Sequence, residues 1–166
     1  HLIGIGGSGM RAIANILIQK GYEVSGSDVK ESDVIERFRK MGATVHIGHN
    51  ADYVQGVDAV VRSTAIREDN PEIVAAKEQG ITILHRSDIV KAVLDVTNGI
   101  AVAGAHGKTS TTSMIGQILV EGQMEPTVII GGEVDYLKGS SCLGKGEYSV
   151  VEADESDGSF LKLRPK

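Results

Sequence analysis

Two glycine-rich loops, each between an apolar run and an amphipathic segment, constrain the fold of this chain more than any other feature. The first is Gly4–Gly9 (GIGGSG), after Leu2–Ile3, and the second is Gly104–Thr109 (GAHGKT), after the apolar residues 100–103. A loop between a strand and a helix directs backbone N–H groups and the helix N-terminus toward an anion. Two such loops predict an α/β protein that handles two phosphorylated ligands, and they favour an enzyme that joins these ligands over a simple binding domain.

The N-terminal part of the chain alternates β-branched runs with amphipathic segments, which predicts a Rossmann-like parallel sheet. In the first predicted helix, an apolar stripe at i, i+3, i+4 and i+7 is formed by Met10, Ile13, Ala14 and Leu17. Pro71 suits the first turn of another helix, which ends before Gly80. The strands predicted for this domain are Leu2–Ile5, Glu23–Gly26, Thr44–Ile47, Ala59–Arg62 and Ile81–Leu84.

A second unit is predicted to begin near Gly99, so that residues 1–97 form one domain and residues 98–166 the start of a P-loop α/β domain. The helix after the second loop is expected to carry one apolar face, formed by Met114, Ile115, Ile118 and Leu119. Further strands are predicted at Val128–Ile130 and Tyr148–Val151, with a glycine-rich connection between them.

Composition excludes several classes of protein. The net charge is −5 and the chain has no basic run, which argues against binding to nucleic acid or to a membrane surface. The chain has no run of 18 apolar residues, so no membrane-spanning segment is expected. Cys142 is the only cysteine, so an internal disulfide is impossible and a cytoplasmic location is expected. The oligomeric state stays open between a monomer and a homodimer.

The first loop has the GxGxxG spacing of dinucleotide-binding proteins. This spacing places Gly4 in a tight turn, Gly6 beside a pyrophosphate and Gly9 where the helix packs on the strand. Asp28 ends the second predicted strand, where a carboxylate contacts a ribose in such folds. The alternative is a structural turn with Asp28 capping the next helix. The loop alone does not distinguish NAD from a UDP-sugar, because both carry a diphosphate.

Two further segments are expected at the same edge of the sheet. Ser63 and Thr64 follow the fourth strand, where they either donate to a phosphate or sugar or begin the next helix. His46 and His49 have an H-x-x-H spacing, but no further ligands stand nearby, so ordinary hydrogen-bonding histidines are favoured over a metal site.

The second loop carries the residues of a short P-loop, GxxGKT. Lysine in such a loop reaches the β- and γ-phosphates of ATP, and the threonine hydroxyl binds Mg²⁺. The acidic run Glu152–Asp157 follows a predicted strand. It is either a solvated turn or a metal site, and Glu152 is the best candidate for Mg²⁺ because it leaves the strand at the edge where the P-loop lies.

These motifs together resemble the Mur ligase family of cell-wall synthesis, in its branch that joins L-alanine to UDP-N-acetylmuramate. The resemblance spans nearly the whole chain, and the short GxxGKT loop is the family's own version. The segments that carry it are His1–Met10, Gly26–Asp28, Ser63–Glu72, Gly104–Thr112, Gly131–Gly132 and Glu152–Phe160.

The resemblance implies an enzyme with three domains that uses ATP, UDP-N-acetylmuramate and L-alanine and forms an acyl phosphate. It implies that Lys108 and Glu152 are catalytic and that Thr109 and Glu152 bind Mg²⁺. The ATP site would consist of Gly104, Ala105, His106, Gly107, Lys108, Thr109 and Ser110. The UDP-sugar site would consist of Gly6, Gly7, Ser8, Gly9, Met10, Ser27, Asp28, Ser63, Thr64, Ala65 and His106. Loop filling is the alternative role for His106.

The chain departs from the family pattern at three places. Ala105 stands where threonine is usual, Ser110 replaces another threonine, and Gly139–Cys142 lies where G-x-N-A is common. The chain also ends before the family's Asn and Asp-His segment, so it is expected to be a fragment that binds the UDP-sugar without completing the reaction.

Two other functions compete with the ligase. An NAD-dependent oxidoreductase would use Gly4–Gly9 and Asp28, but it leaves the second loop and the acidic run without a role. A nucleotide sensor would keep only the UDP-sugar module.

Overall fold

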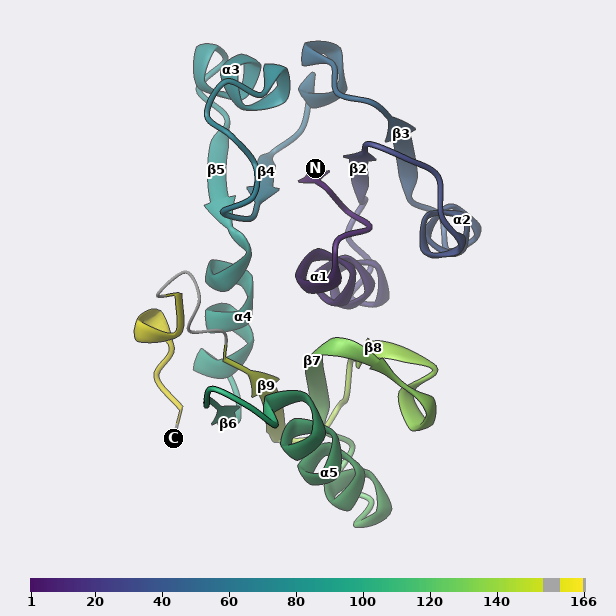
Figure 1. Ribbon diagram of the computed structural model, residues 1–166, viewed down its shortest axis with the longest axis vertical. Coiled ribbons are helices and arrows are strands. Elements are labelled where there is room, and N and C mark those ends of the chain that lie inside the picture. Colours follow the sequence, from purple (N-terminus) through teal and green to yellow (C-terminus); the bar gives the residue numbers. More distant parts are fainter. Residues whose placement is uncertain (154–158, 166) are drawn as a thin grey trace. The chain divides into compact units, whose positions relative to one another are not determined.

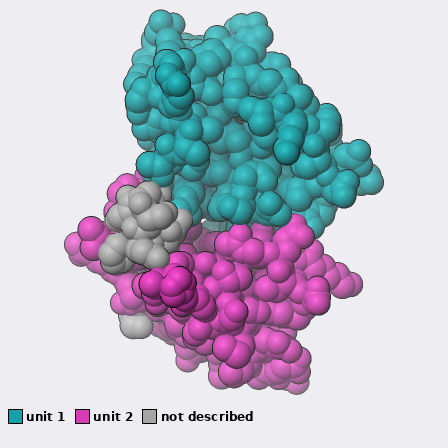
Figure 2. Space-filling model, in the orientation of Figure 1, with its two compact units in different colours: residues 1–86 teal, residues 87–166 magenta. Residues whose placement is uncertain are grey.

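The computed structural model describes residues 1–153 and 159–165, and the chain divides into two compact units. Residues His1–Arg86 form unit 1 and Ser87–Lys166 form unit 2 (Figure 2). This division lies before the predicted domain boundary at residue 97, because all but the first residue of the helix Arg86–Asp95 belongs to unit 2. The assignment of residues 1–97 and 98–166 to two different ligands stays a prediction.

Unit 1 is built on a five-stranded parallel sheet in the order β3-β2-β1-β4-β5 (Figure 1). The sheet reverses its winding direction on the two sides of β1, as in doubly wound folds, which place ligands at the carboxyl ends of the strands. The Rossmann-like fold predicted for this unit is therefore confirmed. The strands are β1 (Leu2–Ile3), β2 (Ser25–Asp28), β3 (Thr44–Ile47), β4 (Ala59–Arg62) and β5 (Thr82–His85).

Helices cover both faces of this sheet (Figure 1). The elements are α1 (Ser8–Gln19), α2 (Asp33–Lys40), the 3₁₀ turn η1 (Ala51–Val54) and α3 (Pro71–Glu78). One buried cluster joins η1 and α3 to the sheet, and it contains Ile3, Val54, Val60, Ile73, Ala75 and Ala76. The predicted stripe on α1 is largely buried, since Met10, Ile13 and Ala14 are at most 3% exposed. Pro71 begins α3 as expected, and the side chain of Asn70 caps it.

The strand predictions for unit 1 are right in number and closest where β-branched residues fill the strand. β3 and β4 have the predicted bounds, whereas β2 begins two residues later than predicted and β5 one residue later. β1 contains only Leu2–Ile3, because Gly4 turns the chain away with a φ of 72°.

Unit 2 contains a four-stranded sheet in the order β6-β9-β7-β8. Its first three strands in that order are parallel, and β8 is antiparallel to β7. The strands are β6 (Asn98–Val102), β7 (Thr127–Val134), β8 (Gly139–Cys142) and β9 (Tyr148–Glu152), and the helices are α4 (Arg86–Asp95) and α5 (Lys108–Glu121). The 3₁₀ turns are η2 (Asp135–Leu137) and η3 (Ser159–Lys162).

The glycine-rich connection predicted from Gly131 to Gly146 is wrong for its first part, and only residues 143–147 connect β8 to β9 without regular structure. β7 continues to Val134, and the chain returns as β8, so the segment forms a hairpin. Its later glycines are required for close packing: a β-carbon at Gly144 would lie 1.9 Å from the carbonyl oxygen of Glu125, and one at Gly146 equally close to that of Met124. These two glycines lie in the short connection between β8 and β9, where they let the chain approach the backbone of the residues that precede β7.

The apolar face predicted for α5 is also wrong in part. Met114 is 57% exposed and Ile118 is 69% exposed, whereas the residues of α5 that are fully buried are Thr112 and Gly116. Small residues face β7 because the side chains there lie very close; a β-carbon at Gly116 would lie 3.2 Å from Val128 Cγ1. Among the described residues, no helix is long and apolar enough to cross a membrane.

Candidate functional site

The glycine loop of unit 1 is held by the end of β2. The amides of Gly4 and Ile5 both donate to the carbonyl oxygen of Ser27, at 2.8 and 3.0 Å. The amide of Gly6 donates to Asp28 Oδ2 at 2.8 Å, and the other carboxylate oxygen accepts from Val29 N. Asp28 therefore holds the loop in shape, and Ser32 rather than Asp28 caps the next helix. The capping alternative for Asp28 is wrong.

Three segments from the carboxyl ends of other strands lie against this loop. A β-carbon at Gly4 would lie 3.5 Å from Ile66 Cδ1, one at Gly6 would lie 3.0 Å from Asp28 Oδ2, and one at Gly9 would lie 3.1 Å from Arg86 Nη1. Ile66 lies in the turn after β4, Asp28 is the last residue of β2, and Arg86 comes directly after β5. The sequence of the loop thus allows three other segments to reach one edge of the sheet.

The first turn of α1 offers the amides that are open to a ligand. Gly6 N is used by Asp28, and Gly7 N donates to Gly4 O at 3.0 Å. Ser8 N and Gly9 N begin the helix and have no acceptor within the described ranges, and Met10, which follows them, is buried. Of the residues predicted to contact the ligand from this loop, Ser8 and Gly9 are therefore the ones whose backbone amides lack an acceptor within the described residues, as an anion site requires.

The segment Ser63–Ala65 forms a turn beside the glycine loop. Ile66 N donates to Ser63 O at 3.1 Å, and Thr64 and Ala65 are exposed. These residues do not begin α3, because Asn70 is its N-cap, so the helix-start alternative is wrong. A role of this turn in binding stays a prediction.

Ser27 was predicted as a ligand contact but is buried instead, and a second residue of unit 1, Arg86, was not predicted as a site residue. Ser27 is fully buried, and its hydroxyl donates to Glu72 at 2.8 Å. It supports the first glycine loop through its carbonyl oxygen, which accepts from Gly4 and Ile5. Arg86 brings a guanidinium group to the first turn of α1, beside Gly9. The signal that could have found Arg86 is its place directly after a strand, at the sheet edge where ligands bind.

The second glycine loop joins β6 to α5. Gly107 is the N-cap of α5 with a φ of 74°, a conformation that favours glycine. The ammonium group of Lys108 donates to Gly104 O at 2.8 Å, which places it across the loop. Ala105, His106 and Ser110 are exposed. The loop thus has the lysine and the helix N-terminus of a phosphate-binding loop in one place.

Glu152 lies beside this loop at the end of β9. Val102, which precedes the loop, pairs with Glu152 in the parallel register of β6 and β9. Thr109 Oγ1 donates to the carboxylate at 3.1 Å from both oxygens, and Gly131 N donates to Oε2 at 2.8 Å. A hydroxyl and a carboxylate, both hard oxygen ligands, therefore meet at the start of α5.

These oxygens fit a magnesium ion that keeps phosphate and water ligands. The described residues contain no cluster of three or more histidine, cysteine or acidic side chains that would hold a metal by themselves. The other carboxylates of the predicted acidic run, Asp154, Glu155 and Asp157, lie outside the described residues.

Gly131 and Gly132 of β7 complete this cluster, although neither was predicted as a site residue. A β-carbon at Gly131 would lie 3.0 Å from Glu152 Oε2, and one at Gly132 would lie 3.2 Å from Thr109 Cγ2. Both glycines allow the strand to approach the two oxygen ligands closely. A glycine pair at the centre of an apolar strand is the signal that points to such an approach.

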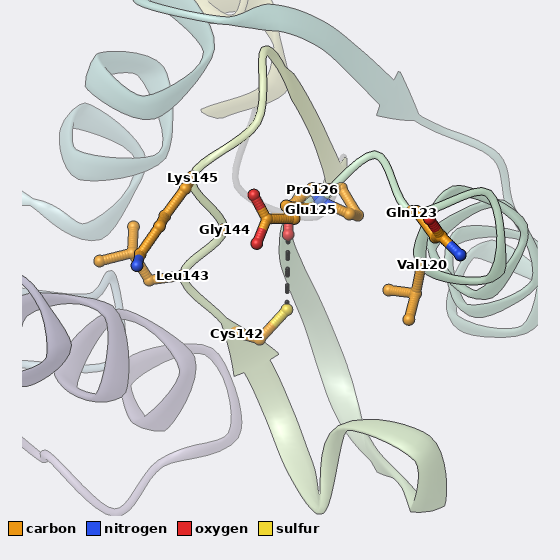
Figure 3. A pocket seen from close by; sticks show the side chains of 8 residues that line it. All are labelled: Val120, Gln123, Glu125, Pro126, Cys142, Leu143, Gly144 and Lys145. Atoms are coloured by element: carbon orange, nitrogen blue, oxygen red, sulfur yellow. Dashed lines mark hydrogen bonds between the residues drawn. The ribbon is translucent and has the colours of Figure 1, made fainter.

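Cys142 belongs to a different part of unit 2. It lines a pocket at the C-terminal end of α5 (Figure 3), together with Val120, Gln123, Glu125, Pro126, Leu143, Gly144 and Lys145. Burial raises the pKa of its thiol, whose Sγ donates to Pro126 O at 3.5 Å. The pocket lies about 18 Å along the helix from Lys108. Cys142 is therefore an unreactive packing residue, and its pocket is separate from the phosphate loop.

Comparison with known proteins gives the family. The model of the Mur ligase family, catalytic domain, matches residues 1–97, which is more than half of the chain. The chain belongs to the Mur ligase family. The resemblance seen in the motifs is thereby confirmed, and enzymes of this family depend on ATP and generally need Mg²⁺.

Named relatives in the Mur ligase family cover nearly the whole chain. The chain is 50% identical to a UDP-N-acetylmuramate–L-alanine ligase of Desulfatibacillum aliphaticivorans and 48% identical to one of Geobacter sulfurreducens, in each case over 99% of the chain. It spans 36% of the length of either relative.

Solved structures agree with this assignment. The UDP-N-acetylmuramate–alanine ligase of Thermotoga maritima matches 99% of the chain with a TM-score of 0.92 at 36% identity, and the chain covers 39% of it. A UDP-N-acetylmuramate:L-alanyl-γ-D-glutamyl-meso-diaminopimelate ligase from Neisseria meningitides matches with a TM-score of 0.91 at 28% identity, and the chain covers 57% of it.

Proposed function

We propose that this chain carries the UDP-sugar site and part of the ATP site of an enzyme that ligates L-alanine to UDP-N-acetylmuramate. This reaction would supply a precursor of peptidoglycan, in the cytoplasm. The observation that carries the proposal is the meeting of Thr109 and Glu152 beside Lys108 at one sheet edge. An NAD-dependent oxidoreductase has no use for such a cluster, and a sensor of the UDP-sugar alone has none either.

Unit 1 would hold the UDP part of the substrate. The amides of Ser8 and Gly9 and the N-terminus of α1 would face the diphosphate, with Arg86 beside them. Gly6, Gly7 and Met10 would shape the loop around it, and Ser27 and Asp28 would support that loop. The turn of Ser63, Thr64 and Ala65 would close the site next to Gly4.

Unit 2 would hold the phosphates of ATP. Gly104–Ser110 would surround them, Lys108 would neutralise charge on the γ-phosphate, and Thr109 and Glu152 would hold Mg²⁺. Bound there, Mg²⁺ would offset the charge that develops on the phosphate oxygens. His106 is exposed on the loop, where it would face the sugar side of the substrate.

The reaction would proceed in two steps. An oxygen of the lactyl carboxylate attacks the γ-phosphorus of ATP, the bond to the β-phosphate oxygen breaks, and an acyl phosphate and ADP form. The amine nitrogen of L-alanine then attacks the acyl carbon, inorganic phosphate leaves with the bonding electron pair, and the amine loses a proton. The site for L-alanine is expected in the part of the relatives that this chain does not match.

Calorimetric titration of the chain with UDP-N-acetylmuramate, with NAD as the comparison ligand, tests the proposal. Micromolar binding of the UDP-sugar alone is the expected result. Binding of NAD alone would overturn the ligase proposal and favour the oxidoreductase.

Gly6→Val is expected to weaken binding of UDP-N-acetylmuramate by about a hundredfold. The branched side chain would begin 3.0 Å from Asp28 Oδ2 and displace the carboxylate that holds the loop. Gly56→Val is a suitable control in unit 1, because no atom lies within 4 Å of a β-carbon there, although its φ of 74° adds backbone strain. The same calorimetric titration measures both, and wild-type affinity in Gly6→Val would mean that the loop has only a structural role.

Glu152→Gln is expected to raise the Mg²⁺ concentration needed for half-maximal ADP formation in the complete enzyme by about 10–100-fold. The amide keeps the shape of the side chain but lacks the charge that Mg²⁺ favours in a ligand. Glu121→Gln, at the exposed end of α5, is the matched control. An unchanged Mg²⁺ dependence in Glu152→Gln would contradict the assignment of the metal site.

A further inference from the structure

A buried carboxylate in unit 1 connects three strands and lies outside the loops described above. Glu72, in the first turn of α3, is fully buried. Its Oε2 accepts from Ser27 Oγ at 2.8 Å and lies 2.7 Å from His1 Nε2, and its Oε1 lies 2.6 Å from His49 Nδ1. His1 Nδ1 lies 2.8 Å from Ser25 Oγ, so both ring nitrogens of His1 are used within the network.

The carboxylate determines which nitrogen of His49 carries a hydrogen. Burial alone would raise the pKa of Glu72, but hydrogen bonds to His1, Ser27 and His49 outweigh it and hold the pKa below its ordinary value. An ionised carboxylate only accepts hydrogen bonds, so His49 must donate from Nδ1. In the neutral ring, Nε2 is then a hydrogen-bond acceptor with a fixed orientation.

The Nε2 atom of His49 is the atom of this network that is available to a ligand. The side chain is 23% exposed, and within residues 1–153 and 159–165 Nε2 has no hydrogen-bond partner. His49 follows β3 by two residues, and the preceding Gly48 N donates to Asp28 O at 2.8 Å. The ring therefore lies at the carboxyl edge of the sheet, next to the residue that holds the first glycine loop.

At this place in a doubly wound fold, His49 would lie beside the nucleoside of a bound nucleotide rather than beside its diphosphate. The residue at the end of the second strand of a doubly wound sheet marks the ribose, and β3 is the next strand outward. A neutral acceptor has no attraction for a phosphate oxygen, which is itself an acceptor. It suits the hydroxyl of a ribose or the imide N–H of a uracil, both of which are donors.

We propose that His49 binds the nucleoside of the UDP-sugar through Nε2, and that Glu72 is a positioning residue that fixes the tautomer and orientation of His49. This inference rests on the function proposed above. The hydrogen-bond donor on the ligand is the ribose 2′-hydroxyl or the uracil imide, and the experiment distinguishes the two.

The test is calorimetric titration of the chain with UDP. His49→Ala is expected to weaken binding by about tenfold, the loss of one hydrogen bond. His46→Ala is the matched control. The ring of His46 stacks on that of Tyr53, with 4.0 Å between the ring centroids, and we propose no contact between His46 and the ligand. Its affinity for UDP is expected to equal that of the wild type.

Glu72→Gln separates positioning from a merely structural role. The amide nitrogen can donate to His49 Nδ1, which would move the ring hydrogen to Nε2 and turn the acceptor into a donor. We expect an affinity loss of about tenfold in the wild-type background and none in a His49→Ala background. The ¹⁵N shifts of the His49 ring are expected to report the exchanged tautomer, and an unchanged tautomer with unchanged affinity would contradict the role of Glu72.

Two analogues identify the donor on the ligand. If the ribose 2′-hydroxyl is the donor, His49→Ala has no effect on binding of 2′-deoxy-UDP; if the imide is the donor, it has none on N3-methyl-UDP. A loss that persists with both analogues overturns the proposal, as does wild-type affinity of His49→Ala for UDP. If the wild-type chain binds neither UDP nor the UDP-sugar, the proposed function itself fails, and this outcome is distinct from the others.

Discussion

Lys108→Ala in the complete enzyme is expected to lower the rate of ADP formation by about 10³-fold. The ammonium group lies across the second glycine loop, with Nζ 2.8 Å from Gly104 O, at the first residue of α5. It is therefore placed to neutralise charge on the transferred phosphoryl group, which alanine cannot do. Because UDP is proposed to bind the other loop, the affinity for UDP-N-acetylmuramate should stay within about twofold. A coupled assay of ADP release and calorimetry measure the two effects.

Lys145→Ala is the control for this prediction. Lys145 is an exposed lysine of the same unit, at the pocket beyond the far end of α5 (Figure 3). Its replacement should leave ADP formation unchanged. Lys108→Arg should not restore the rate, because a planar guanidinium does not replace a compact ammonium group. Turnover at the wild-type rate in Lys108→Ala would show that the loop is not the site of phosphoryl transfer.

The parts of the fold that follow from local patterns could be read from the sequence. Thr44–Ile47 and Ala59–Arg62 are β-branched runs between turns, and they form strands with the predicted bounds. Pro71 and Gly80 bracket α3 because a fixed φ and a positive φ are local properties of these residues. The position of Glu152 beside the second glycine loop could also be predicted from the sequence, because neighbouring parallel strands end at the same edge of a sheet.

The errors arise where tertiary packing decides the structure. Helical spacing predicts that Met114 and Ile118 are buried, but Thr112 and Gly116 are buried instead, and β7 lies so close to α5 that Gly116 faces it. The glycines between Gly131 and Gly146 suggested one loop, although Gly131 and Gly132 lie in β7 and Gly139 begins β8. Spacing along a helix or a strand contains no information on how near the neighbouring element is.

The supporting residues of the candidate site could not be read for a similar reason. Arg86 reaches Gly9 only because β5 and α1 meet at one edge of the sheet. Glu72 is a single acidic residue after a proline, which by pattern is a solvated first-turn carboxylate. Only the fold shows that His1, Ser27 and His49 surround it. Contacts between residues this far apart in the sequence depend on strand order, which local motifs do not give.

Glu72→Ala is expected to lower the free energy of unfolding of unit 1 by about 3–5 kcal/mol at neutral pH. Alanine removes the carboxylate that pairs with His1 Nε2 and with the hydroxyl of Ser27, and both groups stay desolvated after losing this partner. Denaturant titration followed by amide hydrogen exchange in β1, β2 and α3 measures unit 1 separately from unit 2. A loss below 1 kcal/mol would mean that water reaches the network and replaces the carboxylate.

The pH dependence of that stability has a definite sign. The pKa of Glu72 in the folded protein lies below its ordinary value of 4.5, because hydrogen bonds from His1, Ser27 and His49 outweigh burial. The unfolded chain therefore takes up the proton first, and the stabilisation is present above pH 4.5 and lost as the pH falls through the folded pKa. Glu72→Gln should remove this part of the acid dependence.

Hydrogen bonds to Lys77 and Arg62 also lower the pKa of Glu68, but the Glu68 side chain is exposed and water screens its ion pairs. Glu68→Gln should therefore leave the acid unfolding curve nearly unchanged, and an equal effect of the two substitutions would show that burial of the Glu72 network adds nothing.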